Sequence, residues 1–257
     1  MRGTHKETLI RYKRGIKMIK IEHVETLGWK AAIRGMRNPM NSWEKSDSEW
    51  CLIGTPGTNQ AVANDKYLRE KYCIGNNDLD LMKRLCNAGI DHRKFMRMIT
   101  VYMDITAPLY WWKEFDTYKV GTVANSCSTM HKIADKEFTL EDFSCEKLIT
   151  REQPLVEDVD SVEPPNAVWL MNRTIQTLNQ YRNLYLQTKD KKYWWQMIQL
   201  LPSSYNQRRT VMLNYEVLAN MYKSRRNHKL DEWIDFCAEI ERLPHSELIT
   251  KKEDDQK

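Results

Sequence analysis

A short polar stretch, Asn125-Ser126-Cys127-Ser128, carries the side chains best suited to chemistry. Its hydroxyls and its amide can hydrogen-bond to the edge of a base or to a phosphate. Cys127 is a candidate nucleophile, because a thiolate attacks electron-poor carbon once a neighbouring base or cation lowers its pKa. His131 and Lys132 lie close enough in the sequence to be considered for that task. The alternative for Cys127 is a small buried cysteine that only packs.

A second polar set is spaced regularly in the C-terminal part of the chain. It consists of Asn214, Glu216, Asn220, Arg225 and His228. The guanidinium of Arg225 could bind a phosphate through two parallel hydrogen bonds. The alternative is a solvated helix end, where the basic run at 223–226 complements the helix dipole.

The pattern around this second set predicts one long helix, which Ser203 or Ser204 caps and which ends near Arg226. On such a helix Arg225 lies about three turns from Asn214 and shares its face. Apolar residues at helical spacing would form the buried stripe of this helix. These are Val211, Tyr215, Leu218 and Tyr222.

The elements that must position both sets are predicted from apolar periodicity. Strands are expected around Ile19–Val24 and at Phe95–Ile105, with loop and a short helix at 40–77. Further helices are expected at 27–36, 78–88, 108–119, 168–186, 193–201 and 229–241. Asp78 is expected to cap the helix at 78–88, and Gly89 to end it. Together these elements predict an α+β fold, with a central mixed or antiparallel sheet and a helix-rich C-terminal half.

One domain is expected at 18–244, flanked by less regular ends. Residues 1–17 are basic and weakly patterned, which favours a disordered extension over a nucleic-acid-binding arm. Residues 146–166 are rich in proline and carboxylates and are expected to be an insertion. The polar tail at 245–257 is expected to fray.

Composition excludes several classes of protein. The 257 residues are 41% hydrophobic and 29% charged, with 9 Gly and 8 Pro, which favours a sizeable core over a disordered chain. The net charge of +5 suits an anionic ligand without requiring a nucleic acid. The six cysteines form no zinc-type cluster, so no metal is expected, and scattered thiols suit a reducing compartment. Because the sequence contains neither a membrane-spanning apolar run nor a signal-peptide core, we expect a soluble cytoplasmic protein.

The stretch at 107–131, APLYWWKEFDTYKVGTVANSCSTMH, is similar to a motif of the flavin-dependent thymidylate synthase family. In that family a proline-led helix ends in an Arg-His-Arg triplet, and a loop of the pattern Ser-x-Asn-Glu-x-Ser-x-Arg-Tyr follows. Two registers fit. Counting from Pro108 places the triplet at 117–119 and Cys127 at the second serine. Counting from Asn125 places Ser128 at the second serine and His131 at the tyrosine.

A second stretch, at 200–240, is similar to another motif of the same family. The family carries a Leu-Pro, a tyrosine and then Asn-x-Arg-x3-Asn-x4-Arg, with a histidine just beyond. This chain has Leu201-Pro202, Tyr205 and the polar set already described, in which Glu216 replaces the first arginine. The family's early Gly-His-x-Ser-x-x-Glu-His motif is represented only by residues 89–92, Gly-Ile-Asp-His.

The resemblance implies a thymidylate synthase-like fold and a homotetramer that binds FAD, dUMP and a methylenetetrahydrofolate donor at subunit junctions. In that family reduced flavin delivers a hydride to a methylene-bearing uracil. Carried over by position, the catalytic residues are Cys127 and Ser128. The nucleotide-binding residues are Asn125, Ser126, Glu114, His131 and Arg225. The cofactor-binding residues are Tyr118, Lys119, Asn214, Glu216, Asn220 and His228.

Two departures from the family leave three functions open. The triplet keeps only Lys119 as a cation, and Glu216 places a carboxylate near the cofactor unless it pairs with Arg208, Arg209 or Arg225. The first function is a divergent flavin-dependent enzyme that acts on a pyrimidine deoxynucleotide with a folate donor. The second is a flavin-free nucleotide-binding oligomer without catalysis. The third is a cysteine-dependent nucleotide one-carbon transferase.

Overall fold

The computed structural model describes residues 19–54, 68–149 and 166–250. The chain divides into two compact units that alternate along the sequence. Unit 1 draws on residues 1–22, 104–117 and 124–210, and unit 2 on 23–103, 118–123 and 211–257. The expected extension at 1–17, most of the insertion at 146–166 and the end of the tail lie outside the described residues. No helix in the described ranges is both long enough and apolar enough to span a bilayer.

The described part contains a four-stranded sheet in the order β1-β4-β6-β5. Its strands are β1 (Lys20–Leu27), β4 (Thr100–Pro108), β5 (Val123–Ser126) and β6 (Asn206–Asn214). β4 and β6 run antiparallel. At one end Leu109 donates its N–H to the carbonyl of Tyr205 at 3.0 Å, and at the other Tyr215 donates to Ile99 at 3.1 Å. The predicted α+β class with an antiparallel sheet is confirmed.

Strand β6 shows that the long helix predicted at 204–226 is wrong. Gln207, Val211 and Leu213 are buried, whereas Arg208 and Thr210 are exposed and Met212 is half-buried. This alternation has the period of a strand with one buried face. The same apolar residues also fit the spacing of a helix. The sequence of so short a segment therefore does not distinguish a strand from a helix.

The helix α6 (Tyr215–Arg225) begins only after the strand ends. Asn214 is its N-cap, and the Asn214 Oδ1 accepts the N–H of Val217 at 3.0 Å. The predicted apolar stripe is therefore divided between two elements. Val211 belongs to β6, whereas Tyr215 and Leu218 belong to the buried face of α6.

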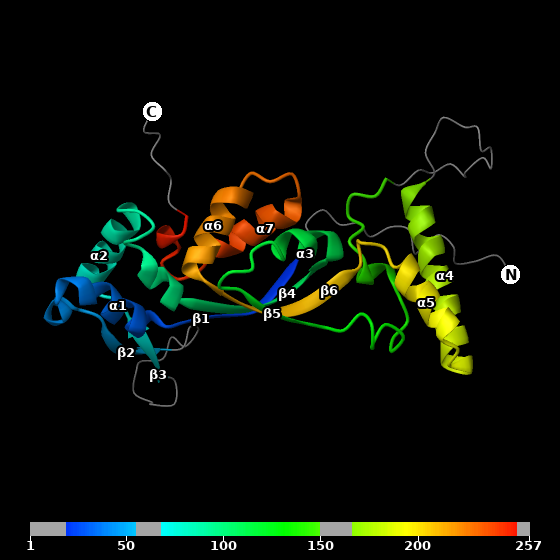
Figure 1. Cartoon of the computed structure of the whole chain (residues 1–257), viewed down its shortest axis with the longest axis horizontal. Helices are drawn as coiled ribbons and strands as arrows, with labels where there is room; N and C mark the ends of the chain where they lie inside the picture. Colours follow the sequence, from blue (N-terminus) through cyan, green and yellow to red (C-terminus); the bar gives the residue numbers. More distant parts are fainter. Residues whose placement is uncertain (1–18, 55–67, 150–165, 251–257) are drawn as a thin grey trace. The chain divides into compact units, whose positions relative to one another are not determined.

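Besides α6, the described part of unit 2 contains three α-helices. They are α1 (Trp29–Arg37), α2 (Asn76–Asn87) and α7 (Asp231–Ile240). A 3₁₀ helix at Lys94–Met98 packs against α1 and α6, and α7 packs against α6 (Figure 1). The strand predicted from Phe95 therefore begins later, at Thr100.

The segment at 40–77, predicted as loop with a short helix, contains an antiparallel hairpin. Its strands are β2 (Glu49–Gly54) and β3 (Leu68–Cys73), and their register pairs Trp50 with Tyr72. The two strands are short, and the residues that pair are distant in sequence. Local periodicity therefore carries little signal for this hairpin.

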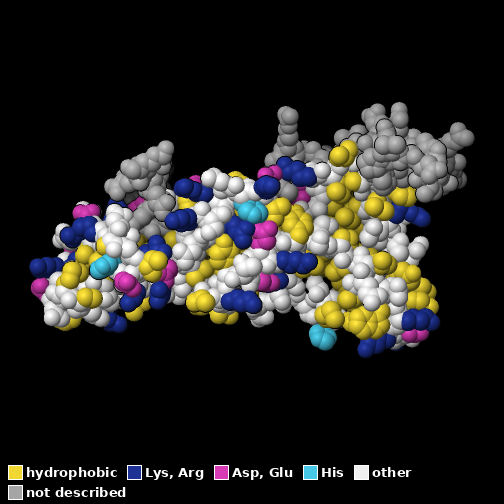
Figure 2. All heavy atoms as spheres, turned by 45° about the horizontal axis from the view of Figure 1, so that its top comes forward, with side chains coloured by type: hydrophobic (Ala, Val, Ile, Leu, Met, Phe, Trp, Pro, Cys, Tyr) yellow, Lys and Arg dark blue, Asp and Glu magenta, His cyan; other side chains and the backbone are white. Residues whose placement is uncertain are grey.

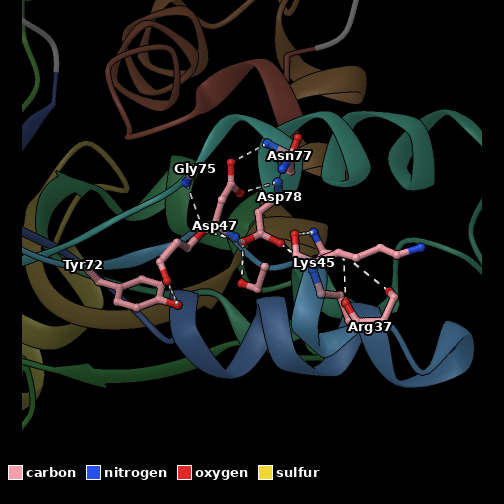
Figure 3. A network of polar contacts seen from close by, with 10 residues as sticks. Arg37, Lys45, Asp47, Tyr72, Gly75, Asn77 and Asp78 are labelled. Atoms are coloured by element: carbon pink, nitrogen blue, oxygen red, sulfur yellow. Dashed lines mark hydrogen bonds and ion pairs between the residues drawn. The ribbon is translucent and has the colours of Figure 1, made fainter.

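A buried ion pair joins α1 to α2 (Figure 3). The Nε of Arg37 donates to Oδ1 of Asp78 at 2.6 Å. The other carboxylate oxygen of Asp78 accepts the hydroxyls of Ser46 at 2.7 Å and Ser48 at 2.6 Å. Burial acts to raise the pKa of Asp78, but these hydrogen bonds and the charge of Arg37 outweigh it and hold that pKa below its usual value.

Asp78 therefore anchors the segment before β2. The prediction that Asp78 caps α2 is wrong. The capping carboxylate comes from Asp47, which accepts the N–H of Asn77 at 2.9 Å and the N–H of Asp78 at 3.1 Å (Figure 3). The N-cap position itself is Gly75, whose Cβ would meet Asp47 at 2.1 Å. A cap supplied from a distant segment cannot be recognised in the local sequence.

Unit 1 contains α3 (Leu109–Phe115), α4 (Ala167–Thr188) and α5 (Lys191–Leu200). α3 is shorter than the predicted 108–119, because turns follow Phe115. α4 and α5 pack against each other (Figure 1). Figure 2 shows hydrophobic side chains gathered over these two helices. The exposed ones are Trp169, Leu170, Leu184, Leu186, Trp195 and Leu200.

The start of the polar tail is ordered, which corrects the expected fraying for residues 245–250. A 3₁₀ turn spans Ser246–Leu248, and Leu248 and Ile249 are buried. The hydroxyl of Tyr215 donates to the carbonyl of Pro244 at 2.5 Å. This bond and the two buried apolar side chains hold the segment against unit 2.

Candidate functional site

Arg225 ends α6 and is held between two aromatic rings of unit 2. Its Nε donates to the hydroxyl of Tyr118 at 3.0 Å. Its guanidinium carbon lies 5.6 Å from the centre of the Tyr118 ring and 4.8 Å from that of Trp233 on α7. These distances are those of cation–π contacts, which restrict the rotation of the side chain. The structure thus pre-orients the guanidinium predicted to bind a phosphate.

His228 lies beside the same aromatic group. Its ring centre is 6.4 Å from that of Trp233, in an edge-to-face arrangement. Its Nδ1 accepts the N–H of Leu230 at 3.2 Å, which places the proton of the neutral ring on Nε2. Tyr118, Arg225 and His228 are therefore brought together. Trp233 joins them, although sequence reasoning did not select it.

Asn214 has a structural task in this arrangement. Besides capping α6, its amide nitrogen lies 2.6 Å from the position that a Cβ on Gly121 would take. Gly121 also has a φ of +75°, a conformation that favours glycine. The turn that follows Tyr118 and Lys119 is thus fitted closely onto the start of α6. Lys119 itself is exposed.

Glu216 is buried and pairs with arginines that sequence reasoning did not select. Its Oε2 accepts the Nε of Arg97, and its Oε1 lies 3.4 Å from Nη2 of Arg97 and 3.7 Å from Nε of Arg93. The hydrogen bond and charge of Glu216 raise the pKa of Arg97 above its usual value. The predicted partners Arg208, Arg209 and Arg225 are engaged elsewhere, with Asp104, Asp116 and Tyr118.

Asn220 completes this arginine cluster, because its Oδ1 accepts Nη2 of Arg93 at 3.3 Å. The Nε of Arg93 is buried without a hydrogen bond. Two guanidinium groups surround one carboxylate, so the cluster of Arg93, Arg97, Glu216 and Asn220 keeps one net positive charge. Asn220 and Glu216 are thus close in space, as their spacing predicted.

The polar stretch around Cys127 belongs to unit 1, where Asn125 and Ser126 end β5. All four side chains of this stretch are exposed, so the alternative of a buried Cys127 is excluded. The Oγ of Ser128 accepts the N–H of His131 at 3.0 Å and forms a turn. His131 is exposed, and Glu114 on α3 is partly buried.

The backbone of Cys127 is fixed by two hydrogen bonds to β6. Its N–H donates to the carbonyl of Arg208, and its carbonyl accepts Nε2 of Gln207, both at 2.9 Å. The Arg208 side chain is itself engaged by Asp104, whose hydrogen bond and charge raise the pKa of Arg208 above its usual value. The predicted neighbours make other contacts, because His131 donates its N–H to Ser128 and Lys132 pairs with Asp135 at 3.0 Å.

Gln207 also connects this stretch to α3 through buried and half-buried groups. Its Oε1 accepts Nε of Arg209 at 2.9 Å, and Nη1 of Arg209 donates to Asp116 at 2.7 Å. The Arg209 guanidinium lies 4.2 Å from the centre of the Trp112 ring. The Nε1 of Trp112 in turn donates to the carbonyl of Gln207 at 2.9 Å. No signal in the sequence identifies Gln207, because its burial and its contacts appear only in the structure.

The predicted residues thus form three groups, two in unit 2 and one in unit 1. Unit 2 contains the group around Arg225 and the arginine cluster around Glu216, and unit 1 contains the stretch around Cys127. In the described ranges no three His, Cys, Asp or Glu side chains gather in a way that could hold a metal ion.

Solved structures with the same fold place these residues in context, although no protein-family model and no curated protein matches the sequence. Two structures of the flavin-dependent thymidylate synthase ThyX from Helicobacter pylori, each with FAD and dUMP, superpose with a TM-score of 0.56. They share 15% and 14% sequence identity and cover 90% of this chain and 96% and 95% of theirs.

A third similar structure is the UMP/dUMP methylase PolB from Streptomyces cacaoi, bound with 5-Br UMP. It superposes with a TM-score of 0.52 at 12% identity, and covers 87% of this chain and 88% of its own. Similarity over nearly the whole length at such low identity defines the fold. The chain has the fold of the flavin-dependent thymidylate synthases, as its two motif-like stretches predicted.

Proposed function

We propose that the protein is a divergent thymidylate synthase-like enzyme, which transfers a one-carbon unit from a folate donor to a pyrimidine deoxynucleotide such as dUMP. The observation that carries this proposal is the side chain of Arg225, held by Tyr118 and Trp233. A fixed guanidinium loses little entropy when it binds a phosphate, and binds it through two parallel hydrogen bonds. The similar structures that contain dUMP or 5-Br UMP support the same ligand class.

In this proposal the stretch at Asn125–Ser128 contacts the base. The amide of Asn125 offers both a donor and an acceptor, as the edge of uracil requires, and the Ser126 hydroxyl adds either. Gln207 holds the backbone of Cys127 and thereby positions the stretch. Glu114 and His131 are the remaining proposed nucleotide contacts, and both stay untested predictions.

The net positive charge of the arginine cluster in unit 2 suits the anionic pyrophosphate of FAD. A bare buried carboxylate at Glu216 would repel a pyrophosphate, but Arg93 and Arg97 neutralise it and leave one positive charge in excess. Arg93, Arg97, Asn220 and Lys119 would hold the cofactor's anionic part, and His228 and Tyr118 its polar edges. Bound flavin supplies reducing equivalents as hydride. A homo-oligomer in the cytoplasm, as the resemblance implies, is part of the same proposal.

Visible absorption spectroscopy and dUMP titration test this proposal together. Purified protein is incubated with FAD, freed of excess and scanned, and dUMP binding is then measured by calorimetry. We expect a protein-bound flavin spectrum and saturable dUMP binding that Arg225→Ala removes. A colourless protein that still binds dUMP would instead support the flavin-free nucleotide-binding function. Folded protein that takes up neither ligand would overturn both.

A cysteine-dependent transferase is a second candidate, because the Cys127 side chain is exposed while its backbone is fixed by hydrogen bonds to Gln207 and Arg208. A thiolate at this position could add to C6 of uracil. Cys127→Ala separates the two candidates, since the flavin route needs no cysteine. Full turnover in this variant would exclude the covalent route.

A further inference from the structure

Unit 2 contains a pocket of about 610 Å³ that includes none of the residues of the candidate functional site. Its lining comes from β1, the start of α1, the hairpin β2–β3 and the segment Pro244–His245. Pockets of roughly 300–1,000 Å³ are typical of small-molecule sites. The size alone therefore suits an organic ligand.

Aromatic rings form much of the lining. Trp50 on β2 is 58% exposed, and its ring meets that of Tyr72 on β3 edge to face at 5.4 Å. Leu27 of β1, which is 53% exposed, and Trp29 also line the pocket. Burial lowers the pKa of His245, so its ring is neutral at pH 7 and adds aromatic surface. A flat ring that covered Trp50 would remove a large apolar area from water.

Three cations share this lining. Lys30 and Arg34 lie one turn apart on α1, and Lys71 comes from β3 next to Tyr72. No carboxylate among the described residues lies within ion-pair distance of any of the three, and Glu70 is the only acidic residue in the lining. α1 also lacks both a side-chain cap and an acidic residue in its first turn, so its positive end is uncompensated.

We propose that this pocket is a second ligand site, which binds a free nucleoside phosphate. The base stacks on the exposed ring of Trp50, which Tyr72 supports edge to face, and the phosphates are neutralised by Lys30, Arg34 and Lys71. Aromatic rings recognise any base by its face, and unpaired cations recognise phosphate. Because the lining excludes Arg225 and its neighbours, this site is occupied independently of the dUMP proposed for the candidate functional site.

Equilibrium dialysis with labelled ATP, GTP, CTP and UTP tests the proposal, with dUMP present at saturation. We expect at least one triphosphate to bind the wild type, and Trp50→Ala to weaken that binding about tenfold or more. Trp50→Phe keeps a ring and should retain most of the affinity. Lys71→Gln should weaken binding and make it less dependent on salt.

Matched controls come from outside the pocket. Trp43→Ala removes a tryptophan that is 50% exposed in the same unit, and Lys113→Gln removes an exposed lysine. Both should bind the triphosphate as the wild type does. Thermal unfolding of every variant shows that the fold is kept. The dUMP affinity of Trp50→Ala should be unchanged, because Trp50 lies outside the proposed dUMP site. Loss of triphosphate binding alone would therefore concern only the second ligand site and not the proposed function.

Three results would overturn the proposal. The first is that no triphosphate binds folded wild-type protein. The second is that Trp50→Ala and Lys71→Gln bind as tightly as the wild type. The third is that inorganic tripolyphosphate or a thymidine oligonucleotide displaces the label better than the matching unlabelled nucleotide. That outcome would mean that the pocket does not recognise a free nucleotide.

Discussion

At the scale of single residues, the account depends most on Arg225. Its hydrogen bond to Tyr118 and its contact with the Trp233 ring hold the guanidinium in one orientation. We expect Arg225→Lys to weaken dUMP binding nearly as much as Arg225→Ala, because an ammonium neither stacks in the same way nor binds a phosphate at two points. Calorimetric titration of both variants measures this.

The matched control for Arg225 is its neighbour Arg226, which is exposed. Arg226→Ala should bind dUMP as the wild type does. A similar loss of affinity in both variants would mean that general positive charge, and not the oriented side chain, attracts the nucleotide.

Glu216 leads to a second prediction at this scale. Glu216→Ala leaves Arg93 and Arg97 without their carboxylate, and should lower the free energy of unfolding by about 1–3 kcal/mol. Glu216→Arg, which restores the family's residue, should destabilise more, because three guanidinium groups would then meet. The double variant Arg97→Glu/Glu216→Arg should recover part of the loss. Urea unfolding of the wild type, Arg97→Glu, Glu216→Arg and the double variant gives the coupling between the two positions.

If Glu216→Arg were as stable as the wild type, the ion pairs around Glu216 would contribute nothing. The same variant also bears on the cofactor. Flavin uptake that increases in Glu216→Arg would mean that the wild-type cluster lacks the positive charge that the pyrophosphate needs.

At the scale of elements, α6 is the helix that carries both Arg225 and Glu216. Leu218 is fully buried at its centre, so Leu218→Ala should lower the free energy of unfolding by about 2–5 kcal/mol. Asn214→Ala removes only the cap and should cost about 1 kcal/mol. Chemical denaturation of both variants gives the two values. A loss in Asn214→Ala as large as that in Leu218→Ala would mean that Asn214 holds more than the helix start.

The link between α1 and α2 should make stability depend on pH. The pKa of Asp78 is lower in the folded protein than in the unfolded chain, so its contribution is present above the unfolded value of about 4. That contribution is lost as the pH falls through the lower folded value. The wild type should therefore lose stability steeply in acid, whereas Asp78→Asn should be less stable at pH 7 and flatter in acid.

Asp80 provides the control for this measurement, because it lies two residues further along α2 and is exposed. Thermal unfolding of Asp80→Asn between pH 2 and 7 should follow the wild type. An equally flat profile in the two variants would mean that the acid sensitivity has another source.

Sequence reasoning recovered the elements whose patterns are local. The helices that became α1, α4, α5 and α7 show clear apolar periodicity, and the structure places them within a few residues of the predicted bounds. β6 and the hairpin β2–β3 were missed, because their strands pair with distant residues and their short patterns also fit other elements. The cap of α2 was assigned to Asp78 because Asp47, which supplies it, lies in another segment.

The sequence predicted part of the candidate site and missed the residues that join it through packing. Motif spacing selected Arg225, His228 and Tyr118, which the structure brings together. It could not select Trp233, Arg93 or Arg97, because their roles arise only from packing around α6. The spacing of a motif identifies the residues that the chain shares with the family. The arginines that neutralise the carboxylate of Glu216 lie outside the motif, so only the three-dimensional structure shows them.

At the scale of the whole molecule, the exposed apolar residues of α4 and α5 bear on the expected homo-oligomer. Apolar side chains that gather on one surface mark interaction sites. We expect light scattering to give a mass about four times the 30.7 kDa of one chain. Leu170→Glu should reduce that mass, whereas Lys113→Gln should not. A 30.7 kDa particle for the wild type would exclude the tetramer.

The central claim is our proposal that the protein transfers a one-carbon unit to a pyrimidine deoxynucleotide. Release of tritium from dUMP labelled at C5 tests it most directly, with FAD, a reductant and methylenetetrahydrofolate present. The account predicts release by the wild type, none by Arg225→Ala, and wild-type release by Arg226→Ala. A folded wild-type protein that binds FAD and dUMP but releases no tritium would contradict the claim, and would leave a nucleotide-binding protein without this catalysis.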